Sequence, residues 1–142
     1  MSTFADTSAV VKLYLDEVDH EVVRALRELV ISRMTRVEVV GAVWGVQRRG
    51  GLDPTRAAVL VGDFEADYAG PDGRFAVVEP VAAVLDDAAA LTGRHGLRAY
   101  DAVQLASARA AAVADDRVRA FAAFDRDLRR AAAVEGFVVV PS

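Results

Sequence analysis

The sequence of 142 residues contains no cysteine, and this absence excludes several chemistries at once. Disulfide bonds, thiol nucleophiles, thiolate zinc sites and iron–sulfur clusters all require cysteine. A chain without cysteine fits a reducing compartment, so we expect a cytoplasmic protein. Histidine is almost absent too: His20 and His95 lie far apart and belong to no recognisable motif. We interpret each as a lone surface histidine and do not expect histidine-based catalysis.

Long hydrophobic runs and an excess of positive charge are also missing. Charged residues interrupt every apolar stretch before it reaches 18 residues, so we expect no transmembrane helix and no role at a membrane. The start MSTFADTSAVVK lacks the basic and apolar regions of a signal peptide, so we expect no export. The net charge of −4 argues against a protein that coats nucleic acid. A nuclease whose acids are concentrated in one site remains possible.

What the sequence does contain is a regular alternation of strand and helix patterns. The length predicts a single domain spanning residues 1–142. Short apolar β-type runs predict strands at 2–5, 28–32, 75–79, 119–124 and 137–140. Helical patterns cover 8–15, 20–26, 35–49, 54–68, 81–93, 99–113 and 126–134. Strands separated by helices predict an α/β fold: a three-layer α/β/α sandwich with a central parallel sheet of about four to five strands.

Carboxylates fall where several of these predicted strands end or helices begin. Asp6 ends the first strand, Glu38 lies one turn into the third helix, and Asp101 lies in the first turn of a later helix. Asp125 ends the fourth strand, and Asp127 follows two positions later. In a parallel sheet these positions share one edge, where ligands usually bind. We therefore expect the acids to converge on one pocket.

Each acid also has a purely structural interpretation. Asp6 and Asp125 could be N-caps of the helices that follow them. Thr35-x-x-Glu38 matches a capping box, and Asp101 could simply complement a helix dipole. These alternatives hold for each residue taken alone, but they do not explain why all four acids fall at one sheet edge.

A cluster of carboxylates favours a hard metal ion. Three or more carboxylates within a few ångströms repel one another unless a cation lies among them. Mg²⁺ and Mn²⁺ prefer oxygen ligands, and such ions support phosphodiester hydrolysis without histidine or cysteine. Arg36, Arg98 and Arg126 lie close in sequence to the acids and are candidates for binding RNA phosphates. A solvated face is the alternative interpretation for these arginines.

Four short motifs, in this order and spacing, resemble the PIN domain, in particular the toxin of VapBC toxin–antitoxin systems. They are the opening D-T-S-A, the T-x-x-E-V helix, R-A-Y-D-A-V-Q-L-A-S-A and F-D-R-D-L. The resemblance implies a Mg²⁺- or Mn²⁺-dependent endoribonuclease with the α/β/α fold inferred above. It also implies a homodimer that a cognate VapB-like antitoxin neutralises. Operator DNA would be contacted only indirectly, through the antitoxin.

The resemblance assigns roles to individual positions. It places Asp6, Glu38, Asp101 and Asp125 at the metal site, with Asp127 as a fifth candidate. Thr7 and Ser8 occupy the polar positions beside the first acid. One position departs from the pattern, because many relatives carry Ser or Thr where this chain has Ala123. A hydroxyl there would orient a carboxylate or a metal-bound water, so its loss bears on how the site is supported.

Other functions fit less well. A haloacid dehalogenase-type phosphatase needs a second Asp where this chain has Ser8, and a response-regulator receiver needs a late lysine where the only lysine is Lys12. The alternative that stays open is a PIN-fold binding module with little turnover, acting mainly in an antitoxin–operator complex. Absence of the hydroxyl at Ala123 leaves that alternative standing.

One helix face carries the only tryptophan. Val40, Val43, Trp44 and Gln47 lie along one side of the predicted helix 35–49. This face is either part of the core or the groove in which an antitoxin helix docks, since Trp is enriched in binding hot spots. Together with helix 54–68 it predicts more apolar surface than one small domain covers, and hence a homodimer.

Overall fold

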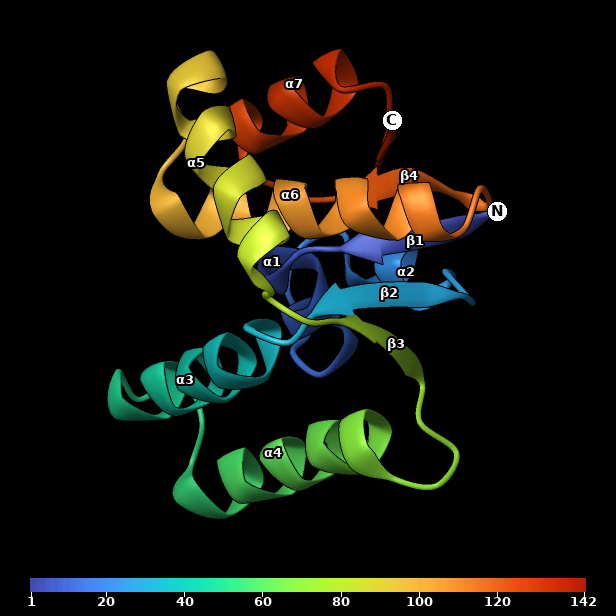
Figure 1. The fold of residues 1–142 in the computed structure, drawn as a ribbon. Helices are drawn as coiled ribbons and strands as arrows, with labels where there is room; N and C mark the ends of the chain where they lie inside the picture. The colour runs from blue at the N-terminus through green and yellow to red at the C-terminus, as the bar shows by residue number, and fades with distance from the viewer.

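The computed structural model describes residues 1–142 and is built around one parallel sheet (Figure 1). Its strands are β1 (Ser2–Ala5), β2 (Leu29–Ser32), β3 (Phe75–Val78), β4 (Val118–Ala122) and β5 (Val138–Val140). They lie in the order β3-β2-β1-β4-β5, and every neighbouring pair is parallel. Phe4 of the central strand pairs with Val30 of β2 on one side and Phe121 of β4 on the other. The predicted parallel sheet is confirmed.

Seven α-helices and one 3-10 helix connect the strands. They are α1 (Thr7–Val10), η1 (Val11–Leu13), α2 (His20–Arg24), α3 (Thr35–Arg48), α4 (Pro54–Ala69), α5 (Ala82–His95), α6 (Ala99–Ala114) and α7 (Arg126–Val134). None of these helices has the length and apolar character that crossing a membrane requires.

Two hydrophobic clusters, one on each face of the sheet, make this a three-layer sandwich. Successive residues of a strand point to opposite faces, so Phe4 belongs to one cluster and Ala5 to the other. Helices α5, α6 and α7 cover the first face, where Phe4 stacks on Phe121 with ring centroids 5.5 Å apart. Helices α1 to α4 cover the second face, where Phe64 lies at the centre of the packed aromatic rings. The α/β/α architecture is therefore confirmed.

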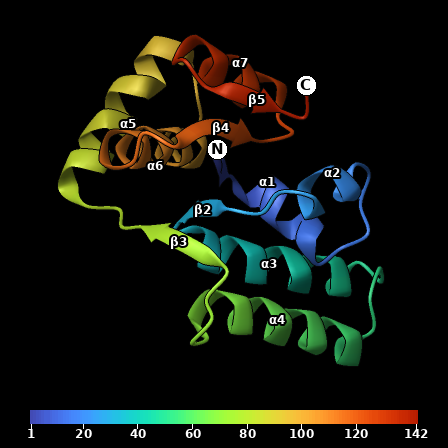
Figure 2. The ribbon, with the colours of Figure 1, turned by 90° about the vertical axis from the view of Figure 1, so that its right-hand side faces the viewer.

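Helices α3 and α4 pack side by side and extend from the lower part of the molecule (Figures 1 and 2). Asp53 starts α4 by accepting a hydrogen bond from the Arg56 amide at 2.7 Å, and Pro54 occupies the first turn. Val43 and Phe64 are fully buried between these helices and the sheet. The pair thus frames one side of the molecule and leaves the start of α3 near the sheet edge.

Two predicted boundaries are wrong in ways that affect the site. The predicted helix 8–15 begins one residue earlier, at Thr7, because Asp6 caps it, and it consists of α1 followed by the 3-10 helix η1, which ends at Leu13. Strand β4 ends at Ala122 instead of 124, so Asp125 lies beyond the strand and caps α7. The apolar residues Ala123 and Phe124 gave this loop the composition of a strand.

Candidate active site

The sequence-predicted acids lie at the carboxyl end of the sheet and at the helix starts beside it. Asp6 follows β1 directly, and Asp125 lies between β4 and α7. Glu38 and Asp101 lie in the first turns of α3 and α6. Their negative charges raise one another's pKa values. Glu38 and Asp101 act on Asp6, Asp101 acts on Glu38, and Asp125 acts on Asp101. The fold thus brings the four carboxylates into one electrostatic group.

Asp6 is the most deeply buried of the four acids. Its pKa is raised to about 7, and burial is the largest cause. The hydrogen bonds from Ser8 and Ala9 lower the pKa, and the negative charges of Asp101 and Glu38 raise it. Ser8 Oγ donates to Asp6 Oδ1 at 2.7 Å, and the Ala9 amide donates to the same oxygen at 2.9 Å. Without a cation this carboxyl group is therefore partly protonated at neutral pH.

The pKa values of Glu38 and Asp101 are also raised, but less than that of Asp6. Burial raises the pKa of Glu38, hydrogen bonds from Thr7 and Gln104 lower it, and the charge of Asp101 raises it again. Burial also raises the pKa of Asp101, which Arg98 lowers and Asp125 raises. In both residues the net shift is upward, as expected for carboxylates that share a site without a cation.

The capping alternatives are right for some of the acids and wrong for one. Asp6 is the N-cap of α1, and Asp125 is the N-cap of α7, accepting from the Leu128 amide at 2.9 Å. These two carboxylates therefore cap helices and also belong to the electrostatic group. The capping box at Thr35 and Glu38 is absent, because α3 begins at Thr35 with no side-chain cap and Glu38 turns toward α6.

The hydroxyl residues beside Asp6 connect separate parts of the site. Thr7 Oγ1 lies 3.4 Å from Thr35 Oγ1, which joins the starts of α1 and α3. Ser8 Oγ accepts from the Phe124 amide at 3.2 Å while it donates to Asp6. Ala123, the position that departs from the motif pattern, is fully buried in the first hydrophobic cluster. Ser8 thus supplies the hydroxyl contact to the loop before Asp125.

Two hollows open beside the carboxylates. A hollow of about 280 Å³ is lined by Glu38, Arg98, Ala99, Tyr100 and Asp101. A second, of about 170 Å³, is lined by Gly96, Leu97, Arg98, Asp101, Asp125 and Asp127. Because the two hollows share Arg98 and Asp101, a bound chain of phosphates could pass along both. Asp127 lies on the rim of this groove, 3.2 Å from Arg130.

The three candidate arginines differ in their contacts. Arg98 is 84% exposed and lies 3.7 Å from Asp101, in both hollows. Arg126 is 93% exposed at the start of α7 and lies 4.0 Å from Asp127. Arg36 instead pairs with Glu65 of α4 at 3.0 Å and lies over the Tyr68 ring. Arg98 and Arg126 are therefore better placed than Arg36 to meet a phosphate.

The chemistry of the site fits a hard cation, although the site is not a closed cage. Every charged donor is a carboxylate oxygen, the ligand type that Mg²⁺ and Mn²⁺ prefer. No three acidic or histidine side chains lie close enough together to bind one ion directly. Mg²⁺ keeps several of its waters and needs only one or two carboxylates of its own, so this open spacing suits it.

Two residues of the site were not foreseen from the sequence in this role. Gln104 and Thr35 are buried, at 3% and 0% exposure, and their side chains are hydrogen-bonded 3.1 Å apart. Gln104 follows Asp101 by three residues, which places both on one face of α6. A single polar residue in the apolar stretch 102–106 is the pattern that points to it.

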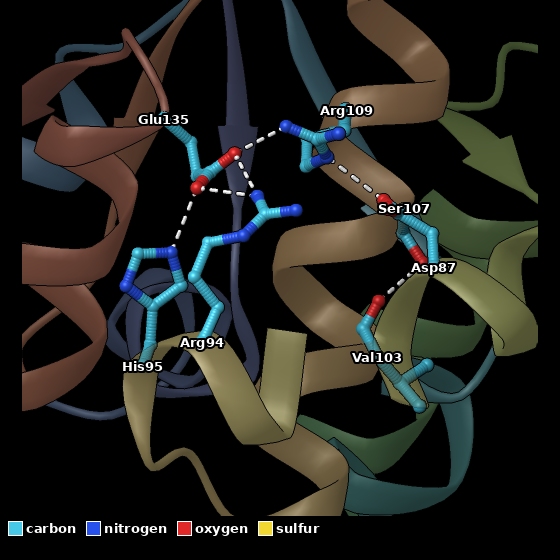
Figure 3. A network of polar contacts seen from close by, with 7 residues as sticks. All are labelled: Asp87, Arg94, His95, Val103, Ser107, Arg109 and Glu135. Carbon is cyan, nitrogen blue, oxygen red and sulfur yellow. Dashed lines mark hydrogen bonds and ion pairs between the residues drawn. The ribbon is translucent and has the colours of Figure 1, made fainter. Parts of the chain in front are cut away.

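The interpretation of His95 as a lone surface histidine is wrong. Its side chain is 10% exposed and lies 2.7 Å from Glu135, which also binds Arg94 and Arg109 (Figure 3). Figure 3 shows these side chains converging from α5, α6 and the end of α7. None of them lines either hollow beside the acids. The network ties helices together on one face of the sheet and is not part of the candidate site.

The helix face that carries Trp44 is divided between core and surface. Val43 is fully buried, whereas Val40 and Trp44 are partly buried and pack against the second hydrophobic cluster. Gln47, one turn farther along, is also partly buried. The core interpretation therefore holds for Val43 and for part of the Trp44 ring. The docking interpretation of the exposed remainder stays a prediction.

Comparisons with known proteins identify the family. The PIN domain family matches residues 3–134. Among solved structures, Mycobacterium tuberculosis VapC20, described as a sarcin–ricin loop cleaving toxin, is 20% identical, with a TM-score of 0.65 over 96% of this chain and 97% of that one. FitAcB from Neisseria gonorrhoeae is 21% identical, with a TM-score of 0.59 over 96% and 95%.

A toxin–antitoxin complex from Klebsiella pneumoniae is also similar, with 18% identity and a TM-score of 0.59 over 96% of both chains. A comparison with curated protein sequences gave no match. The structural likenesses establish the fold, and the family match covers nearly the whole chain, including all the candidate acids. The chain therefore belongs to the PIN domain family.

Proposed function

We propose that this protein is a Mg²⁺- or Mn²⁺-dependent endoribonuclease of the VapC type, the toxin of a type II toxin–antitoxin system. The observation that carries the proposal is the group of four carboxylates, Asp6, Glu38, Asp101 and Asp125, supplied by four separate elements at one edge of the sheet. A fold that only capped its helices would not need to bury Asp6 to 4% exposure beside the charges of Glu38 and Asp101. Two of the structural neighbours, a sarcin–ricin loop cleaving toxin and a toxin–antitoxin complex, support the same assignment.

In this proposal the carboxylates hold the cation and the arginines hold the substrate. Asp6 at the start of α1, Asp101 in α6 and Asp125 at the start of α7 would hold the ion, one or two of them directly and the others through its bound waters, with Glu38 and the rim residue Asp127 beside them. A divalent ion bound there would polarise the scissile phosphodiester and acidify a bound water. The chain's own residues do the rest, and they act by positioning.

Ser8 fixes one of these positions. Its hydroxyl donates to Asp6 Oδ1 and leaves the other carboxylate oxygen free of that contact. Arg98, which lines both hollows, can pair with a phosphate beside the acids, and Arg126 can meet the next one along the groove. Because both guanidinium groups are strongly exposed, they are free to reach RNA.

The proposed partners follow from the same surfaces. The exposed parts of Val40, Trp44 and Gln47 on α3 form the surface on which a VapB-like antitoxin or a second copy of this chain would dock. Operator DNA would then be reached only through the antitoxin.

A second function, a PIN-fold binding module with little turnover, is favoured by two observations. The acids do not form a closed ligand set, and the position of Ala123 lacks the hydroxyl of many relatives. Such a module would bind its antitoxin and operator complex without cleaving RNA.

Expression of this chain alone in bacteria separates the two functions. We expect growth arrest with wild-type protein and none with Asp125→Asn. Asn still caps α7, so the variant removes the charge and leaves the helix start. The matched control is Asp53→Asn, which changes an N-cap at the start of α4, outside the site, and should still arrest growth. Arrest that persists in Asp125→Asn would favour the binding module.

A further inference from the structure

The side chain of Gln104 has no explanation in terms of packing alone. It is 3% exposed and lies in the middle of α6, where its neighbours Ala102, Leu105 and Ala106 are all buried apolar residues. A hydrophobic side chain of the same size would fill this position without the loss of hydration that a buried amide suffers. The amide must therefore do something that a hydrophobic side chain would not do.

Its contacts all point to the candidate site. Gln104 Nε2 lies 3.2 Å from Glu38 Oε1, 3.1 Å from Thr35 Oγ1 and 3.3 Å from Thr7 Oγ1. These three oxygens belong to the starts of α3 and α1. One amide on α6 thus joins the three helices that carry or flank three of the four carboxylates.

The orientation of the amide follows from its neighbours. A carboxylate only accepts hydrogen bonds, so the NH₂ end must face Glu38. This leaves Gln104 Oε1 buried with no hydrogen-bond partner, the single such side-chain atom in the structure. An unpaired buried acceptor destabilises the fold. The molecule therefore tolerates a loss of stability at Gln104 while the donor end is held on Glu38.

We propose that Gln104 is a positioning residue of the carboxylate site. Its amide fixes the Glu38 carboxylate and the Thr7 and Thr35 hydroxyls relative to Asp101, which lies one turn earlier on the same face of α6. The proposal rests on the metal-dependent function proposed above and adds a residue that supports the acids without touching RNA. Groups that orient metal ligands in this way typically contribute ten- to a hundredfold to metal affinity or activity.

The test compares two substitutions at this position. Gln104→Met keeps the length and volume but removes the donor and also the unpaired acceptor. Gln104→His keeps a ring N–H donor at a similar reach. The matched control is Ser107→Ala, one turn farther along α6, where a buried hydroxyl bonds only to the Val103 carbonyl at 2.7 Å.

Two measurements are made on the full chain. The first is the melting temperature as a function of Mg²⁺ concentration. The second is the split between kcat and KM on a labelled RNA fragment that wild-type protein cleaves, chosen by mapping RNA ends after brief expression.

We expect Gln104→Met to melt in metal-free buffer at or above the wild-type temperature. It should need at least tenfold more Mg²⁺ for the same rise in melting temperature, and its kcat should fall at least tenfold with KM within threefold of wild type. Gln104→His should recover a large part of both losses, and Ser107→Ala should behave as wild type. If Gln104 had only a structural role, kcat would fall only in variants whose melting temperature in metal-free buffer also falls.

Gln104→Met with wild-type kcat and a wild-type Mg²⁺ response would overturn the positioning role and leave the proposed function intact. Equal losses in Gln104→Met and Gln104→His would overturn it as well. Wild-type protein that neither cleaves RNA nor responds to Mg²⁺ would instead remove the proposed function, and the positioning role with it.

Discussion

At the scale of single residues, two acids of the candidate site have both a structural role and an electrostatic one. Asp6 and Asp125 cap α1 and α7, and they also repel the other carboxylates of the site. Capping stabilises a helix by about 1 kcal/mol, whereas burial of a charged carboxylate destabilises the fold. The balance between these effects is what mutations of the acids measure.

Asp101→Asn separates a site carboxylate from one that only complements a helix dipole. Removing one charge relieves repulsion, so the metal-free variant should be as stable as wild type or more stable, by about 1 kcal/mol. Mg²⁺ at ten times its dissociation constant should stabilise wild type by about 1.4 kcal/mol and the variant much less. Thermal melts with and without Mg²⁺ check this. A variant destabilised by up to about 1 kcal/mol that still cleaves RNA would leave Asp101 with a dipole role only.

Asp6 predicts an unusual pH dependence of the metal-free protein. Its pKa is raised to about 7 in the folded state, far above the value of an unfolded chain. The unfolded state therefore loses this proton first as pH rises, so the free energy of unfolding falls between about pH 4 and pH 7 and then levels off. The shift from 3.8 to about 7 is about three pKa units, and one unit corresponds to about 1.4 kcal/mol, so the decrease is on the order of 4 kcal/mol.

Urea unfolding of wild type and Asp6→Asn across that range, in chelator, measures this decrease. Asn keeps the contacts of Oδ1 and cannot ionise, so the slope should flatten in the variant. The control Asp53→Asn, at an exposed N-cap, should keep the wild-type slope. Parallel curves for wild type and Asp6→Asn would show that Asp6 titrates normally.

At the scale of helices and strands, the sequence predicts most elements correctly and misplaces a few ends. The density of β-branched and aromatic residues finds every strand, because the strands are short apolar segments. It fails at Ala123 and Phe124, where a loop has the composition of a strand: Ala123 is fully buried and its amide still donates to the Val140 carbonyl at 3.2 Å, although the strand ends at Ala122. It also misses the network around Glu135, because a polar contact between distant helices leaves no local pattern. The position of Gln104 is marked by a single polar residue in an apolar stretch, but its contacts with Glu38 and Thr35 leave no sign in the sequence.

The Glu135 network connects helices α5, α6 and α7, and its contribution to stability can be measured. The Glu135 side chain is 7% exposed; burial raises its pKa, but the hydrogen bonds from Arg94 and His95 and the charge of Arg109 lower it overall. Glu135→Gln would remove the charged partner that Arg94 and Arg109 share, and because these guanidinium groups are 49% and 35% exposed, we expect a loss of about 1–2 kcal/mol in the free energy of unfolding.

Urea denaturation measures the loss in Glu135→Gln. Glu79→Gln, which removes the exposed ion pair with Arg33, should change stability much less. Neither variant should alter the response to Mg²⁺. Equal effects of the two substitutions would mean that burial of the network contributes nothing.

At the scale of the whole molecule, assembly is the open prediction. Val37 and Val59 on α3 and α4 are exposed, and Trp44 is only partly covered. Apolar side chains of this kind on a small domain favour association with a second copy. We expect a homodimer at micromolar concentration in the absence of antitoxin, measured by light scattering. Val37→Asp combined with Val59→Asp should yield the monomer, and a monomeric wild type would contradict the prediction.

The central claim is that the four carboxylates form a metal-dependent ribonuclease site, and RNA cleavage by purified protein tests it most directly. Wild-type protein should cleave RNA with Mg²⁺ or Mn²⁺, poorly with Ca²⁺, whose bonds are longer, and not at all in excess chelator. Asp101→Asn should lose cleavage under every condition, while Asp53→Asn should retain it. Undiminished cleavage by wild-type protein in chelator, or by Asp101→Asn with Mg²⁺, would contradict the account.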